Sequence, residues 1–349
     1  MTLRDIVGHR RLKRLLMRAV HSGSLPQSLV FAGPEGVGKR QTALALAQAL
    51  NCLNPAVDEE GLQDACGTCA SCGKVGRGLH PDVMVIRRED DKKSIPVSEA
   101  REINRHVAYR PFEGLFRVVI VDGADELGAD TQDALLKTLE EPPPRNVFIL
   151  VTSRPDMLFT TVLSRCCVLR FAPLAPADVA AALAGRHGLS ERDALAAAAL
   201  SGGSLGRALQ LGDAADADLR GLAVRLLSAA VQTTDERARL EAGAGLLKPA
   251  AKKPSTVEKG GKSQADRAAL AASLRAMESL LRDVAVLTTR APDAALVNLD
   301  LRAELEPLAR RYDRDRAGRA FSAVGRSLVA LERHNASPKI VVDWLALQL

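Results

Sequence analysis

The sequence predicts an α/β domain built on a parallel sheet, followed by a region made of helices only. Short apolar runs alternate with helical patterns through the first half of the chain, and a glycine-rich loop follows the first run. After residues 171–176 the pattern becomes helical throughout. Each run is short, rich in β-branched or aromatic residues and bounded by turn residues, as buried parallel strands are. The runs lie at 28–33, 82–87, 117–123, 146–153 and 167–173.

Three helices are expected between these strands. The first, 39–51, is rich in Ala and Leu and follows the glycine loop. The second, 97–109, starts after a proline. The third, 130–140, places three leucines on one face and stops at a run of prolines. This alternation of strands and helices is typical of a doubly wound α/β domain.

The rest of the chain divides into two helical regions. A compact unit is predicted over 174–213, where an SGGS turn leads into its last helix. A second all-helical region covers 214–349. Within it, residues 248–264 combine Pro, Gly, Lys and Ser with almost no apolar residues, which predicts a disordered surface loop. The expected first domain is therefore 1–173.

Length and composition set further limits. The 349 residues are enough for two or three domains. No apolar run is long enough to cross a bilayer, and the first residues lack a secretory apolar core. We therefore expect a cytoplasmic protein with no membrane partner. The net charge of +6 permits a nucleic-acid partner without requiring one.

The stretch GPEGVGKRQT begins as a phosphate-binding loop, with glycines at Gly33, Gly36 and Gly38. Such glycines let the backbone turn its N–H groups toward an anion. A helix begins near Lys39, with the positive end of its dipole toward the phosphates. The next residue should offer a Ser or Thr hydroxyl to magnesium, but it is Arg40, whose guanidinium has no acceptor lone pair.

A second motif, VVIVDGADEL, delivers Asp122 at the carboxyl end of an apolar strand, where an α/β fold places its ligands. In a hydrolase of this kind Asp122 would hold magnesium through water. The next residue would be a glutamate that activates the attacking water, but here it is Gly123. Arg40 and Gly123 together remove the direct metal ligand and the general base, so we expect no ATP hydrolysis by this chain.

Four cysteines cluster, at Cys52, Cys66, Cys69 and Cys72. In a reducing cytoplasm such a cluster indicates a metal more often than disulfides. Four thiolates satisfy a tetrahedral zinc ion in a closed structural site. An iron–sulfur cluster is the competing interpretation, but the ferredoxin-type fourth Cys followed by Pro is missing, which favours zinc. A zinc-dependent DNA-binding module is a lower-ranked interpretation.

The stretch TTVLSRCC places Arg165 in a turn just before a strand. An arginine there can project from a subunit edge and stabilise phosphate charge in a neighbouring subunit. A lone arginine of this kind is more often a solvated or salt-bridged surface residue. Cys166 and Cys167 follow directly, and we expect them to be small buried thiols near the strand.

Together these motifs resemble the clamp-loader branch of the AAA+ family, and the resemblance covers nearly the whole chain. The order of the motifs is more specific than any one of them. They are IVGH, SLVFAGPEGVGK, the four cysteines, HPD, VVIVDGADEL, ALLKTLEEPP, LVTSRPDMLFTTVLSRC and GGSLGRAL. The terminal NASPKIVVDWLALQL is similar to the last helix of clamp-loader collar domains.

The resemblance implies an ATPase-type domain with a zinc module at 52–72, a small helical lid and a helical collar that oligomerises. It implies a hetero-pentameric ring with gamma/tau and delta subunits, which places a sliding clamp on primer–template DNA. Thr152 would be the sensor 1 residue, Arg207 the sensor 2 residue on the lid, and Asp122 the Walker B acid. Arg165 would be an arginine finger aimed at ATP in an adjacent gamma/tau subunit.

Two functions fit these residues. The favoured one is a ring subunit that hydrolyses no ATP and supplies Arg165 to its neighbour. The alternative is an active AAA+ motor, because Lys39, Asp122, Thr152 and Arg207 remain and could hold ATP with magnesium bound through water. The sequence leaves open whether the loop binds ATP or ADP at all. No constellation for nucleotidyl transfer is evident, so any DNA polymerase activity would belong to a holoenzyme.

Overall fold

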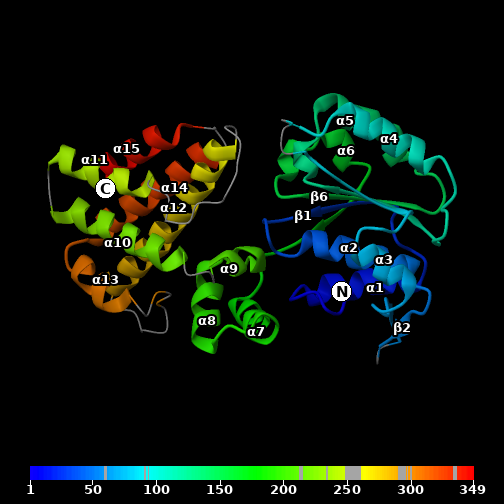
Figure 1. Ribbon diagram of the computed structural model, residues 1–349, viewed down its shortest axis with the longest axis horizontal. Helices are drawn as coiled ribbons and strands as arrows, with labels where there is room; N and C mark the ends of the chain where they lie inside the picture. The colour runs from blue at the N-terminus through cyan, green and yellow to red at the C-terminus, as the bar shows by residue number, and fades with distance from the viewer. Residues whose placement is uncertain are drawn as a thin grey trace. The chain divides into compact units, whose positions relative to one another are not determined.

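The computed structural model describes residues 1–349 apart from 59–60, 90–91, 93, 212–214, 233–234, 248–260, 290–295, 297, 299–300 and 333–335. The chain forms two compact units (Figure 1). One comprises residues 1–188 and 201–208, and the other comprises 189–200 and 209–349. The three-domain division with boundaries after 173 and 213 stays a prediction.

The predicted α/β fold class is confirmed by the sheet of the first unit. Its strands are β1 (Ser28–Ala32), β4 (Val83–Arg87), β5 (Arg117–Asp122), β6 (Asn146–Thr152) and β7 (Cys167–Arg170). All neighbouring strands are parallel, in the order β4-β5-β6-β1-β7. Every strand lies within a predicted run. Because β6 lies between β5 and β1, the ends of these three strands meet at one edge of the sheet.

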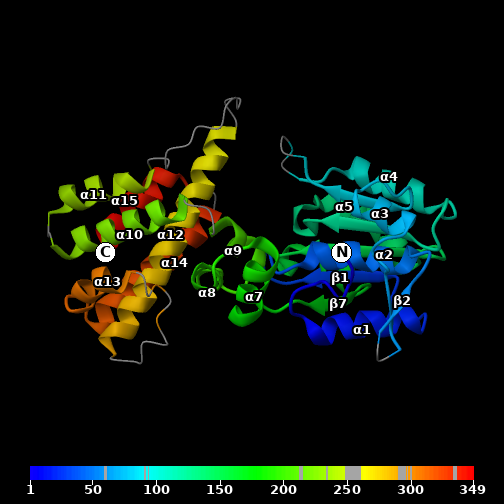
Figure 2. The same ribbon diagram turned by 60° about the horizontal axis from the view of Figure 1, so that its bottom comes forward.

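Helices cover both faces of this sheet (Figures 1 and 2). One face packs against α1 (Arg10–His21), α2 (Lys39–Asn51) and α3 (Ala70–Gly76), and the other against α4 (Val97–Val107), α5 (Ala129–Glu140) and α6 (Thr160–Leu163). The alternation of strand side chains supplies both cores: Leu29 and Phe31 enter the first, whereas Val30 enters the second. The bounds of α2 match the prediction, and α4 ends two residues earlier than the predicted Tyr109.

The cysteine module is an insertion between α2 and β4. It contains an antiparallel hairpin of β2 (Ala56–Val57) and β3 (Gln63–Asp64), followed by α3. Short 3-10 turns follow two of the central strands, η1 (Ala124–Glu126) after β5 and η2 (Pro155–Met157) after β6. These turns place polar side chains at the edge where the strands end.

The remaining described elements are helices: α7 (Pro176–His187), α8 (Glu191–Leu200), α9 (Leu205–Leu211), α10 (Ala215–Gln232), α11 (Glu236–Ala244), η3 (Gly245–Leu247), α12 (Gly261–Thr288), α13 (Arg302–Ala309), α14 (Arg314–Glu332) and α15 (Pro338–Gln348). Helices α10 to α15 bury one apolar core, in which Leu274, Met277, Leu280 and Val342 are fully buried.

Most of the expected loop, 248–260, lies outside the described residues, and residues 261–264 form the first turn of α12. No helix in the described part of the chain is long and apolar enough to cross a membrane.

Candidate functional site

The glycine loop connects the end of β1 to the start of α2 at Lys39. Gly36 and Gly38 have φ angles of 73° and 102°, in the left-handed region that favours glycine. The nearly buried ammonium group of Lys39 donates hydrogen bonds to the carbonyl oxygens of Gly33 and Pro34, both at 2.6 Å. Burial lowers the pKa of Lys39, although nearby carboxylates oppose this effect. The loop therefore has the predicted phosphate-binding shape, and its lysine is held by the loop itself.

Arg40 forms an ion pair with Asp122. Its Nε atom lies 3.2 Å from Asp122 Oδ2, without the alignment of a hydrogen bond. The contact joins the first turn of α2 to the end of β5, the two places from which a P-loop enzyme addresses magnesium. Arg40 therefore places a fixed positive charge beside the acid that would otherwise hold a metal through water.

Gly123 follows Asp122 in a left-handed conformation, with φ 86° and ψ 48°. A Cβ atom at this position would lie 3.0 Å from Glu126 Oε2, closer than such contacts normally are. A glutamate in this backbone conformation would be strained. The missing general base is thus accompanied by a backbone shape that favours glycine.

Thr152 and Asp125 are brought together by the neighbouring ends of β6 and β5. The Thr152 hydroxyl donates to Asp125 Oδ1 at 2.8 Å, and Arg154 Nε donates to Asp125 Oδ2 at 3.0 Å. Burial raises the pKa of Asp125, but these donors and the N–H of Ser153 outweigh it, so the pKa is lowered overall. The sequence indicated Thr152 but missed Asp125 as its partner, since 27 residues separate the two.

The first turn of α9 packs directly against the glycine loop. The N–H of Gly206 donates to the carbonyl oxygen of Gly36 at 3.0 Å. A Cβ atom on Gly206 would lie 3.1 Å from the Cα atom of Gly36, a tight contact, so this close approach favours glycine. Arg207, the predicted sensor 2 residue, is the next residue along, and its N–H donates to Ser204 Oγ.

Arg165 lies in the turn between α6 and β7. Its Nε and Nη2 atoms both lie 2.8 Å from Glu140 Oε2, and Nη1 donates to the carbonyl oxygen of Thr161 at 3.1 Å. All three guanidinium nitrogens therefore have acceptors within the chain, although the side chain remains 31% exposed.

The expectation that Cys166 and Cys167 are buried was wrong at Cys167, which is exposed because β7 forms an edge of the sheet.

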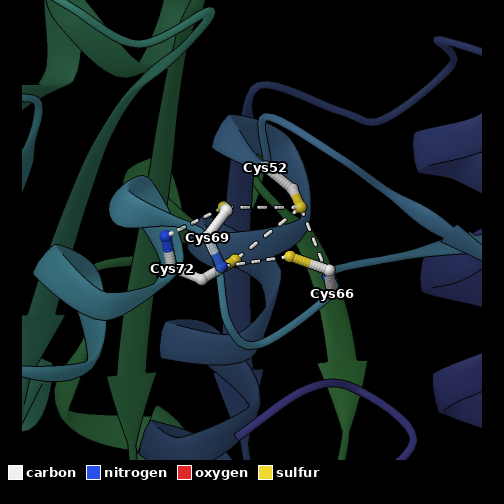
Figure 3. A group of neighbouring side chains, drawn as sticks. All are labelled: Cys52, Cys66, Cys69 and Cys72. Carbon is white, nitrogen blue, oxygen red and sulfur yellow. Dashed lines mark hydrogen bonds between the residues drawn. The ribbon is translucent and has the colours of Figure 1, made fainter.

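The four clustered cysteines form one candidate metal centre (Figure 3). Their Sγ atoms all lie within 4.8 Å of one another. The N–H groups of Thr68 and Cys69 lower the pKa of Cys66 to about 6, whereas burial raises the pKa of Cys52 and Cys72. Four converging thiols could hold a tetrahedral metal ion, and its identity as zinc stays a prediction.

A buried ion pair that the sequence did not indicate lies where β4 and β5 begin, at the other ends of the strands from the glycine loop. Asp82 and Arg117 are joined at 3.1 Å, and their side chains are 0% and 5% exposed. Asp82 also accepts the N–H groups of residues 112–114, whereas Arg117 donates to carbonyl oxygens of residues 106, 109 and 110. Burial raises the pKa of Asp82, but these donors lower it more. The HPD motif, which ends at Asp82, was the feature of the sequence that could have indicated this ion pair.

The strand order, the glycine loop after β1 and the acid at the end of β5 define a P-loop domain of the AAA+ class. Residues 8–175 match the model of the family described as "DNA polymerase III, delta subunit". Residues 8–175, just under half of the chain, are thus similar to this family of DNA polymerase III subunits.

Curated relatives include two kinds of subunit. The chain is 35% identical over 162 residues to DNA polymerase III subunit tau of Bacillus subtilis, covering 46% of this chain and 27% of the relative. It is 31% identical over 166 residues to subunit delta' of the same organism, covering 48% of each. It is 35% identical over 149 residues to subunit delta' of Pseudomonas aeruginosa, covering 43% of each. The chain thus spans less than half the length of these relatives.

Solved structures resemble the chain more distantly. A DNA polymerase III gamma-subunit-related protein from Thermotoga maritima is 16% identical, with 96% of this chain and 97% of that chain covered, at a TM-score of 0.44. A likeness at that score does not identify a fold, which is established here by the strand order and the phosphate loop.

Proposed function

We propose that this chain is the delta-prime subunit of a DNA polymerase III clamp loader and that it hydrolyses no ATP itself. The observation that carries this proposal is the ion pair between Arg40 and Asp122. Magnesium needs oxygen ligands, and the arginine offers none. Its guanidinium also neutralises the remaining acid, so a divalent cation would have to displace a charge that is already paired.

The backbone at Gly123 supports the same conclusion. A general base at this position would have to adopt a left-handed conformation against Glu126. Loss of the metal ligand and of the base affects the two steps on which phosphoryl transfer depends, metal positioning and activation of water. The ion pair and the conformation of Gly123 therefore both favour a subunit that performs no hydrolysis.

The contacts of the loop support a comparatively rigid subunit. Lys39 is bonded to two carbonyl oxygens of the loop, and Gly206 is bonded to Gly36. Hydrogen-bonding groups of the chain itself thus hold the loop's shape. A rigid partner suits a subunit whose task is to position one side chain for its neighbour.

That side chain is Arg165. In a ring with gamma/tau and delta subunits it would face ATP held by an adjacent gamma/tau subunit. Phosphate oxygens there would replace the carboxylate of Glu140 as acceptors, because a guanidinium binds both kinds of group in the same geometry. The assembled ring would load the sliding clamp onto primed DNA in the cytoplasm.

ATP turnover by the purified chain tests this proposal. With magnesium and ATP present, the chain is expected to release no phosphate above a protein-free blank, since the metal ligand and the base are both missing. A gamma/tau subunit in the same assay is the positive control. Magnesium-dependent turnover by this chain would instead establish the alternative, an active motor that uses Lys39, Asp122, Thr152 and Arg207.

A further inference from the structure

The N-terminal segment, residues 2–9, lies between the cysteine module and the phosphate loop. It precedes α1 and contains turns rather than a helix or strand. Each end of the segment contacts a different neighbour through buried groups. These contacts connect the candidate metal centre to the nucleotide site by a route that no motif in the sequence indicates.

The first end is held by Asp64, whose side chain is 0% exposed. Its carboxylate accepts the N–H of Leu3 at 3.2 Å, the N–H of Arg4 at 2.9 Å and the N–H of Ala65 at 2.7 Å. The Arg4 guanidinium lies 3.5 Å from the same carboxylate and donates to the carbonyl oxygen of Ala56 at 3.0 Å. A buried carboxylate with several N–H donors is a strong anchor, because its charge strengthens each bond.

Apolar packing reinforces this anchor. Leu3 is fully buried in the same core as Leu62 of the hairpin and Val75 of α3. Burial of this apolar side chain therefore stabilises the contact. The segment is thus bound to the cysteine module by charge and by apolar contact together.

The second end meets the phosphate loop. Ile6 is buried beside Gly38, and His9 Nε2 forms a hydrogen bond with the carbonyl oxygen of Val37 at 3.0 Å. Because a carbonyl oxygen only accepts, the Nε2–H of His9 donates this bond, and burial lowers the pKa of the ring. The backbone of His9 has a φ of 47°, and its ring packs edge-on against Phe171 at 4.9 Å. Such a conformation persists only where the surroundings determine it.

Helix α2 forms a second, direct connection between the cysteine module and the phosphate loop. It begins at Lys39 in the phosphate loop and ends beside Cys52, one of the four thiols. Cys66 lies two residues after Asp64. A metal bound by the four thiols would link Cys52 to Cys66 and so fix Asp64 relative to α2.

We propose that the cysteine module positions the phosphate loop, with Asp64 as the residue through which it acts. The module holds Asp64 in place, Asp64 holds the N-terminal segment, and the segment holds Val37 and Gly38. This inference does not depend on whether the chain hydrolyses ATP. It gives the metal centre a structural task at the nucleotide site rather than one in binding DNA.

Hydrogen–deuterium exchange on the full chain tests this proposal. Metal analysis of the purified protein comes first, and zinc is expected. In Asp64→Asn protein, residues 2–9 and 33–40 are expected to exchange about tenfold faster or more, because several bonds to a charged acceptor are weakened. Strands β5 and β6 should be unchanged, and zinc should be retained. Removal of zinc from the unaltered protein by a chelator should accelerate the same two segments.

Asp58→Asn is the matched control. Asp58 lies in the same hairpin and accepts the N–H of Leu62 at 2.8 Å. The Asp58→Asn variant removes the same charge from the module, and residues 2–9 and 33–40 should exchange as slowly as in the unaltered protein. If Asp64→Asn protein lost zinc, Arg4→Met would replace it, because this variant removes the guanidinium contacts from outside the module. Faster exchange at 2–9 with unchanged exchange at 33–40, in whichever variant keeps zinc, would overturn the proposal.

Discussion

Replacing Arg165 with alanine is expected to stop ATP hydrolysis at one site of a reconstituted clamp loader while the ring still assembles. A guanidinium placed against the transferring phosphate from a neighbouring subunit increases the rate by about 10³ to 10⁵-fold. The site facing this subunit should therefore slow by about that factor. In the free chain Arg165 is held by Glu140 and Thr161 at the surface, so its loss removes no buried contact. DNA-stimulated ATPase and clamp loading by the complex measure the effect.

Two variants make this experiment specific. Arg165→Lys keeps the charge but loses the planar pair of donors, so it should restore little activity. Arg170→Ala removes the same charge from the exposed end of β7 and should leave hydrolysis unchanged. Gel filtration of each complex checks assembly. Full ATPase and clamp-loading activity in the Arg165→Ala complex would contradict the assignment of this residue.

Replacing Arg117 with methionine is expected to lower the free energy of unfolding by about 3–5 kcal/mol. The change leaves Asp82 as a buried charge without its partner, and breaking a buried ion pair in this way has a cost of that size. It also leaves the carbonyl oxygens of His106, Tyr109 and Arg110 without the guanidinium donors that now satisfy them. Urea unfolding followed by circular dichroism gives the measurement.

Arg105→Met is the control for this prediction. Arg105 pairs with Glu102 at 3.0 Å, and the two side chains are 69% and 48% exposed. A surface pair of this kind contributes about 0–1 kcal/mol, so the control should unfold almost as the unaltered protein does. Equal stability of the Arg117→Met protein and this control would show that the buried pair is not a main support of the sheet edge.

The sheet and the phosphate loop could be predicted because their signals are local. Each strand is a short apolar run between turn residues, and α2 follows its glycine loop without interruption. The cysteine cluster was equally accessible, since three of its four members lie within one heptapeptide, CGTCASC. Local composition and spacing therefore indicated the class of fold and the candidate metal centre.

The pairings within the site could not be predicted, because they depend on which strand ends lie side by side. Arg40 meets Asp122 only because α2 and β5 deliver them to one edge of the sheet. Thr152 meets Asp125 for the same reason, and the edge position of β7 explains why Cys167 is exposed. Strand order has no periodic signature in a single sequence. Sequence motifs can therefore indicate such residues, but they cannot indicate which residues those side chains contact.

The pre-steady-state burst of ATP hydrolysis by a reconstituted complex, measured with ATP in excess, tests the central claim most directly when Lys39→Ala is present in this subunit alone. Lys39 is the loop residue that would contact the phosphates of any nucleotide bound here. Because this subunit is proposed to hydrolyse no ATP, the amplitude and rate of the burst should equal those of the unaltered complex. A burst smaller by the share of one site, in a complex shown to be fully assembled, would contradict the claim.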